Sequence, residues 1–168
     1  MFGVRLQDSF NRQINAELYS AYLYLAMSSW FDSQNFPGMA SWMRIQAQEE
    51  QQHALKFYDF VQERDGRVIL TAIEAPQGEW SSPLAAFEDA LAHERKVTGM
   101  INDLVDLAIA EKDHAANVFL QWFVTEQVEE EATAGQIVDR LKVVADNPVA
   151  LLMVDDQLGK RAPEPGAE

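Results

Sequence analysis

A carboxylate and an imidazole three residues apart are the feature of this sequence that most directly indicates chemistry. They are Glu50 and His53 of the segment Glu50-Gln51-Gln52-His53. Residues three or four positions apart lie on one face of a helix, so both side chains would project the same way. Carboxylate oxygen and imidazole nitrogen are ligands for divalent metals such as iron and manganese. The spacing therefore indicates a metal site on a helix.

Similar polar residues interrupt apolar stripes of helical periodicity on what would be four separate helices. The set is Glu17, Glu50, His53, Glu94, Gln127 and Glu130. Carboxylates facing one another in an apolar core would cost on the order of several kcal/mol each if unpaired. No Lys or Arg lies level with them on these stripes, and two divalent metals would supply the missing charge. A lone buried Glu or His is more often a hydrogen-bonded core residue, but a matched set favours metal.

The sequence separations show that these residues can meet. In an antiparallel helical hairpin, two residues are level when the turn lies at their sequence midpoint. The midpoint of Glu17 and Glu50 is 33.5, and that of Glu94 and Gln127 is 110.5; both fall at plausible turns. Each pair is 33 residues apart, and a shift of 77 residues carries the first pair onto the second. We interpret this as a faint internal repeat.

The elements that must position this set follow from Gly and Pro, which divide the chain into long segments. We expect helices at about 5–32, 37–64, 84–111 and 114–145, and a short fifth helix at about 148–159. The linker 66–83 can extend about 59 Å, whereas a helix of about 28 residues is about 42 Å long. A crossover that runs the length of two hairpins is typical of ferritin-like four-helix bundles. The expected fold is therefore all-α, a bundle of that kind.

Composition narrows the class of protein. The 168 residues fit a single domain, 1–168, with the bundle at about 5–145 and a disordered tail at about 161–168. There is no cysteine, which excludes disulfides, thiolate metal sites and thiol catalysis. A net charge of −14 disfavours nucleic acid as a partner and favours small cations.

The start of the sequence lacks a basic stretch followed by an apolar run, so we expect no secretory signal. The longest uncharged run near the start lies between Glu17 and Asp32, which is shorter than the ~20 apolar residues that cross a bilayer. We therefore expect a cytoplasmic protein without a membrane partner.

Residues beside the polar set are open to two interpretations. Tyr24, two turns beyond Glu17, is either a core aromatic with a satisfied hydroxyl or a residue with a role in redox chemistry or ligand orientation. Glu49, Glu126 and Glu129 flank the ligand stripe. They could be solvated surface residues, but their clustering suggests an extra cation site.

Two further expectations concern regions outside this set. His93 and His114 are expected to be exposed or loop histidines. A second apolar stripe of the first helix, Tyr19, Tyr22, Leu23, Ala26 and Trp30, should meet either a second subunit or the long linker, with Val68-Ile69-Leu70 as the linker's covering segment.

Several motifs resemble the non-haem ferritins of bacteria and archaea, in the family's order and spacing and over nearly the whole chain. They are Asn11-Arg12-Gln13-Ile14-Asn15-Ala16-Glu17, Tyr22-Leu23-Tyr24, Glu49-Glu50-Gln51-Gln52-His53, Phe119-Leu120-Gln121-Trp122 and Glu126-Gln127 through Glu131. The resemblance implies a catalytic di-iron centre, to which we also assign Tyr24. Its first iron would be bound by Glu17, Glu50 and His53, and its second by Glu50, Glu94 and Glu130 with Gln127 close by. Glu49, Glu126, Glu129 and Glu130 match the third iron site of prokaryotic ferritins.

Departures from sister families sharpen the resemblance. Haem-containing bacterioferritins carry a second Glu-x-x-His motif, and the corresponding segment of this chain runs from Gln127 to Glu130. They also carry a haem-ligating Met, and this chain has Gln51 at that position. We therefore expect no haem. Rubrerythrins add a Cys-rich iron domain, which this chain cannot form because it has no cysteine. Mini-ferritins place their sites between subunits and lack a fifth helix, whereas this chain supplies all the ligands itself. In the non-haem ferritins the fifth helix lines a channel on a symmetry axis, so the resemblance implies a polar lining from Asp155, Asp156 and Lys160.

The function implied by the resemblance is iron storage and detoxification. The chain would act as a ferroxidase that oxidises Fe(II) with O2 or H2O2 and deposits ferric oxyhydroxide inside a homo-oligomeric shell of 24 subunits. The alternatives are a di-iron peroxidase or oxidase that stores nothing, and a catalytically inert protein that only forms shells.

Overall fold

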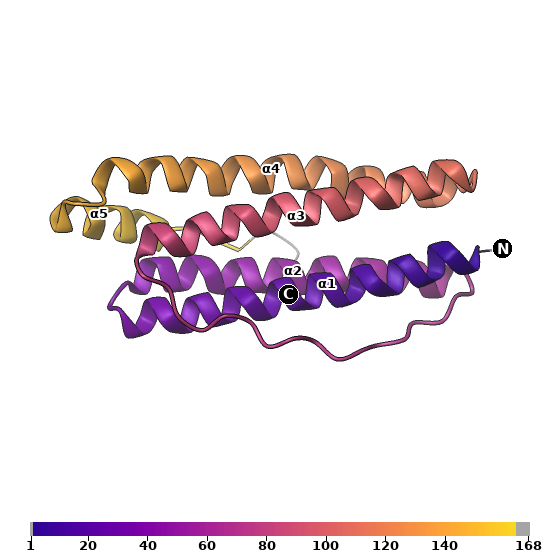
Figure 1. Cartoon of the computed structure of the whole chain (residues 1–168), viewed down its shortest axis with the longest axis horizontal. Coiled ribbons are helices and arrows are strands. Elements are labelled where there is room, and N and C mark those ends of the chain that lie inside the picture. The colour runs from indigo at the N-terminus through magenta and orange to yellow at the C-terminus, as the bar shows by residue number, and fades with distance from the viewer. Residues whose placement is uncertain (1, 164–168) are drawn as a thin grey trace.

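Five helices make up the fold in the computed structural model, which describes residues 2–163 and shows no strand among them (Figure 1). They are α1 (Val4–Ser33), α2 (Pro37–Glu63), α3 (Pro83–Ala110), α4 (His114–Val144) and α5 (Pro148–Leu158). The expected all-α bundle with a long crossover and a short fifth helix is confirmed, and every helix boundary lies within about a residue of the predicted one. None of the described helices is both long and apolar enough to span a bilayer.

Local signals explain where the helices begin and end. Ser82, Asp113 and Asn147 each accept a hydrogen bond from the backbone N–H three residues later, at 3.0, 3.0 and 3.1 Å, and so cap α3, α4 and α5. Proline occupies the first turn of α2, α3 and α5, where its missing N–H costs nothing. The first three helices are each followed by a residue with φ between 56° and 61°, namely Asn35, Asp65 and Lys112.

Two antiparallel hairpins, α1/α2 and α3/α4, form the bundle, and the crossover between them lies along α1 (Figure 1). Two asparagines of α1 fix this crossover. Asn11 donates to Arg67 O at 3.0 Å and accepts from Ile69 N at 2.9 Å. Asn15 donates to Thr71 Oγ1 at 2.9 Å. Asn11 and Asn15 of the first family-like motif thus anchor the linker, whereas Glu17 at the end of that motif belongs to the polar layer.

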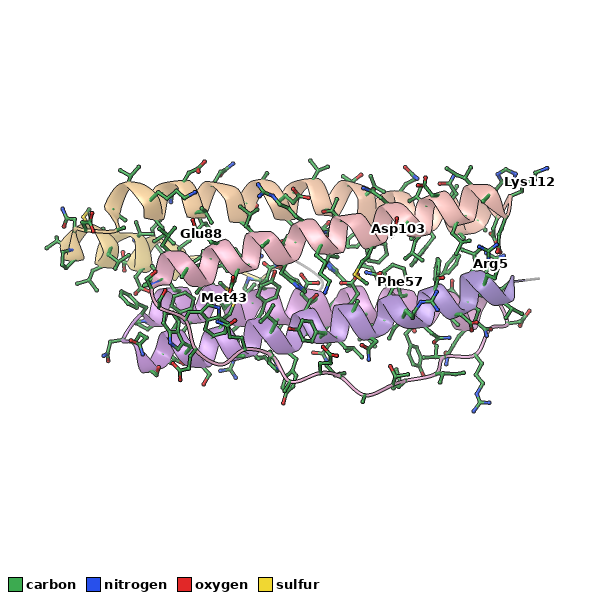
Figure 2. The ribbon with its side chains drawn as sticks, viewed as in Figure 1. Arg5, Met43, Phe57, Glu88, Asp103 and Lys112 are labelled. Carbon is green, nitrogen blue, oxygen red and sulfur yellow. The ribbon has the colours of Figure 1, made fainter. Side chains whose placement is uncertain are left out.

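The buried apolar residues form two clusters that occupy opposite halves of the bundle. One contains Phe31, Met43 and Phe87, and the other contains Phe10 and Phe57. Figure 2 shows Met43 and Phe57 near the interior of the bundle, and both are fully buried. On each of the four long helices, the polar residues singled out above lie between the segments that build the two clusters. The core is therefore divided by a polar layer.

The second apolar stripe of α1 is partly covered within the chain. Leu23 and Trp30 are 7% and 6% exposed, and the Trp30 ring lies 5.6 Å from that of Trp80 in the crossover. Tyr22 remains 50% exposed. Covering by Val68-Ile69-Leu70 was a wrong expectation, since Ile69 and Leu70 are exposed and the indole of Trp80 does the covering instead.

α5 turns back at the end of α4 and packs against the start of α2 (Figure 1). Its Asp155 is buried and accepts hydrogen bonds from Gly38 N at 3.1 Å and Met39 N at 2.8 Å. The carboxylate thereby caps α2 from a distant part of the chain. This corrects the expectation of a polar lining for Asp155; Asp156 and Lys160 are exposed and pair at 2.7 Å.

Candidate metal centre

Four helices bring the predicted ligands into one buried layer. Glu17 comes from α1, Glu50 and His53 from α2, Glu94 from α3, and Gln127 and Glu130 from α4, and none of these residues is more than 8% exposed. They meet because the α1/α2 and α3/α4 loops begin at the sequence midpoints, 33.5 and 110.5, of the pairs Glu17/Glu50 and Glu94/Gln127. Burial of this many acids in one layer calls for protons or cations between them.

Glu17, Glu50 and His53 form one close group of possible ligands. Each offers one ligand atom, and these atoms lie within 4.8 Å of one another. His53 Nδ1 lies 3.3 Å from Glu50 Oε2. Gln13 donates to Glu17 Oε1 at 2.8 Å, whereas Glu17 Oε2 has no hydrogen-bond partner among the described residues. A buried carboxylate oxygen without a donor, next to a second carboxylate and an imidazole, fits a divalent metal.

Glu94 lies across the layer and is held by two donors. The Tyr24 hydroxyl donates to Glu94 Oε1, and Gln127 Nε2 donates to Glu94 Oε2 at 3.2 Å. Gln127 also reaches Thr98 Oγ1 at 3.3 Å, and Thr98 donates to Glu131 at 2.6 Å. Glu94 is absent from the close three-ligand groups, so a second site with Glu50 and Glu130 would need these side chains to move closer together.

Gln46 links Glu50, the residue assigned to both irons, to Glu130 of α4. Its Nε2 donates to Glu130 Oε2 at 2.7 Å and to Glu50 Oε1 at 3.3 Å. Gln46 was not among the residues predicted from the sequence. It is buried and precedes Glu50 by one helical turn, so it is also a polar residue within an apolar stripe and was predictable on that ground.

The acidic groups in this layer favour their neutral forms when no metal is bound. Burial first, and then the charge of Glu50, raises the pKa of Glu17 to about 8. Burial also raises the pKa of Glu50 and of Glu130 well above 4.5, with neighbouring carboxylates adding to the effect. The pKa of Glu94 is raised by burial, against the lowering effect of Tyr24 and Gln127. Without metal these carboxyl groups therefore hold protons, and bound cations would replace those protons.

The three acids expected to form an extra cation site, which we call the outer acids, are Glu49, Glu126 and Glu129, and they differ in exposure. Glu49 is 9% exposed, Glu126 is half-buried and Glu129 is exposed. A second group of possible ligands joins His53, Glu126 and Glu130 within 4.8 Å, and it does not include Glu129. His53 and Glu130 are thus members of the inner layer that also lie close to Glu126.

His93 differs from its expected surroundings. It lies on α3 and is largely buried, with Ser20 Oγ 2.7 Å from its Nε2 and its ring 6.0 Å from that of Tyr24. Burial, reinforced by the charge of Lys96, lowers the pKa of His93 to about 4. The expectation of an exposed or loop histidine was therefore wrong for His93. His114 is exposed, as expected.

Comparisons with known proteins agree with this geometry. A family model for a ferritin-like domain matches residues 7–144. The bacterial non-heme ferritin of Bacteroides fragilis is 44% identical over 161 residues, 96% of this chain and all of that protein. That of Staphylococcus saprophyticus is 40% identical over 162 residues, 96% of this chain and 97% of that protein. The solved structure of an open pore ferritin from the archaeon Archaeoglobus fulgidus is similar with a TM-score of 0.96 and 52% identity, over 96% of this chain and all of that one.

Proposed function

The chain belongs to the ferritin family, and from this we propose that it oxidises Fe(II) at the buried carboxylate and histidine layer and stores the ferric product in a multi-subunit shell. The observation that carries the proposal is the group of Glu17, Glu50 and His53, whose ligand atoms lie within 4.8 Å of one another. The apolar stripes of the described helices carry no Lys or Arg at this level to balance the charge of these carboxylates. Iron is the substrate of this reaction as well as the cargo.

Binding of Fe(II) would displace the protons that burial places on these acids. Glu17 Oε2 and His53 would take the first iron, and Glu94 and Glu130 the second, with Glu50 between them. Gln46 and Gln127 orient these carboxylates by donating to them. Oxygen donors suit Fe(III) better than Fe(II), so the same ligands favour loss of an electron.

The electron balance requires a two-electron acceptor. Two Fe(II) give up one electron each, and O2 takes both together with two protons to form H2O2. With H2O2 as the oxidant, the same two electrons and two protons give two molecules of water. The Tyr24 hydroxyl donates to Glu94, so we assign Tyr24 to orienting that carboxylate.

Glu49, Glu126 and Glu129 would act after oxidation rather than during it. One group of possible ligands already joins Glu126 to His53 and Glu130, and Glu49 and Glu129 are the sequence neighbours of Glu50 and Glu130. A third iron held here would stand next to the oxidising pair. We expect this site to affect the ratio of iron to oxygen consumed and the later turnover.

Iron loading followed by size-exclusion chromatography tests this function. Fe(II) is added aerobically in large excess over the predicted sites, and iron and protein are measured in each fraction. A large assembly that retains many more irons than its sites can bind supports storage. Saturation at two or three irons per chain would contradict it and indicate an oxidase without storage. A shell that neither oxidises nor retains iron would indicate an inert shell protein.

A further inference from the structure

The chain after α5 places a basic side chain on the acidic cluster. Arg161 Nη2 donates to Glu49 Oε2 at 2.5 Å, and its Nη1 donates to Gln46 Oε1 at 2.8 Å. The guanidinium also lies over the Trp42 ring, 4.6 Å from its centroid. Only 23% of the Arg161 side chain and 11% of the Glu49 side chain are exposed. An arginine from the expected disordered tail is thus fixed by three contacts, while residues 164–168 of that tail lie outside the described residues.

These three contacts follow the face of α2 that leads to the metal centre. Trp42, Gln46 and Glu49 are spaced at i, i+4 and i+7, which aligns them along one side of the helix. The next residue, Glu50, is a ligand candidate of the inner layer. Arg161 therefore approaches the site along a stripe that ends at the ligands.

The docking of α5 makes this approach possible. Gly159 lies against Gly38, and a Cβ added to Gly38 would meet Asp155 O at 1.8 Å. The close contact needs glycine at position 38, and Asp155 holds the same junction by capping α2. Because Arg161 follows Gly159 by two residues, this junction sets where the guanidinium reaches α2.

Arg161 meets a carboxylate that borders the ligand candidates. Glu49 directly precedes Glu50 in α2, and both Glu49 and Gln46 accept hydrogen bonds from the Arg161 guanidinium. A guanidinium on Glu49 stands where a cation would otherwise sit, and a metal bound at the same carboxylate would be repelled by it. Gln46 links Arg161 to the inner layer, because its Oε1 accepts from Arg161 while its Nε2 donates to Glu50 and Glu130.

We propose that Arg161 is a tethered counter-cation that holds Glu49 until a third metal displaces it, so that the segment after α5 is a latch on the third metal site. This inference rests on the proposed function, because it assigns a third metal to Glu49. It adds a competitor that belongs to the chain itself. Binding of the third metal should release Arg161 from Glu49, whereas binding at the inner layer should leave it in place.

Anaerobic titration with Co(II), a divalent probe that needs no oxidant, tests the competition in the assembled protein. Arg161→Ala should raise the affinity for the third Co(II) about tenfold, equivalent to ~1.4 kcal/mol, and change the first two affinities by less than about threefold. Arg161→Lys keeps the charge and should stay close to the native protein. Lys160→Ala removes a charge from the same segment, but its side chain is exposed and pairs with Asp156, so it serves as the matched control.

Hydrogen exchange supplies the second readout. In the native protein, amides of residues 159–162 should exchange faster once the third Co(II) binds, and they should not respond to the first two. Equal third-site affinity in the native protein and Arg161→Ala would overturn the inference, as would a variant that binds only two metals. Measuring iron oxidation in the same proteins separates the claims: normal oxidation without Co(II) competition rejects the latch alone, and competition without oxidation rejects the proposed function alone.

Discussion

Protonation of one carboxyl group links the metal centre to stability. The side chain of Glu17 has an ordinary pKa of 4.5, and burial raises this pKa to about 8 in the folded chain. Between these two values the folded state holds a proton that the unfolded state has lost. Stability that is present below pH 4.5 is therefore lost as the pH rises through about 8.

The metal-free protein should accordingly become less stable as the pH rises from about 5 to about 8.5, by an amount on the order of several kcal/mol. Glu17→Gln keeps the shape without the ionisation, so its melting temperature should fall less over this range. Adding metal should also reduce the fall, because the cation takes the place of the proton. Melting curves at several pH values measure this, and equal slopes for the native protein and the Glu17→Gln variant without metal would contradict the assignment.

Glu94 and Glu129 offer a matched pair for testing where oxidation occurs. Both are glutamates, but Glu94 is 2% exposed in the inner layer and Glu129 is exposed on α4. Glu94→Gln should slow the first burst of Fe(II) oxidation by about tenfold or more, since even mutating a residue that only orients a metal ligand typically costs about 10- to 100-fold. Glu129→Gln should leave this burst unchanged and alter later turnover. Rapid-mixing absorbance measures both, and equal loss of the burst in the two variants would reject the division between inner and outer acids.

At the residue scale, the sequence predicted which side chains would lie together but not all of what holds them. Glu17, Glu94 and their partners were predictable because a polar residue in an apolar stripe is conspicuous. Their assignment to individual irons stays a prediction. Arg161 was not predictable, because its position depends on how α5 packs. The burial of His93 likewise depends on its packing against Ser20 and Tyr24 of α1, which helical periodicity does not reveal.

At the scale of elements, α5 is held by a small number of precise contacts. Asp155→Ala removes the acceptor for two backbone N–H groups at the start of α2 and should cost about 1 to 2 kcal/mol. Asp156→Ala is the control, because that carboxylate is exposed and pairs with Lys160. Hydrogen exchange should show faster exchange at the start of α2 and through α5 in the Asp155 variant alone. Equal exchange in both variants would show that the cap contributes little.

The helices themselves were the most predictable feature. Gly and Pro mark their ends, and the midpoints 33.5 and 110.5 locate the two short loops correctly. The crossover was predictable in length but not in contacts. Trp80, and not Val68-Ile69-Leu70, covers Trp30, because extended segments have no periodicity from which a contact can be read.

At the scale of the whole molecule, an exposed apolar groove of about 390 Å³ lies between α1, α2 and the crossover, with Tyr22, Leu25 and Ile73 among its residues. We expect this groove at a contact between subunits. Leu25 is 48% exposed and Leu23 is 7% exposed, so the two leucines separate assembly from folding.

Leu25→Glu should release smaller species that keep their helical content, because truncating an interface anchor commonly costs about 2 kcal/mol or more. Leu23→Glu should instead lower the stability of the subunit, since it buries a charge inside the chain. Sedimentation velocity and circular dichroism distinguish the two outcomes. An intact large assembly from Leu25→Glu would place the subunit contact elsewhere.

The measurement that tests the central claim most directly is a rapid-mixing titration of Fe(II) oxidation with increasing iron per chain. Glu50 is the residue common to both proposed iron sites, so its variant should affect both. The account predicts a fast burst whose amplitude stops growing at two irons per chain, and loss of that burst in Glu50→Gln with the helical fold retained. A burst of the same rate and amplitude in Glu50→Gln, or no break at two irons in the native protein, would contradict it.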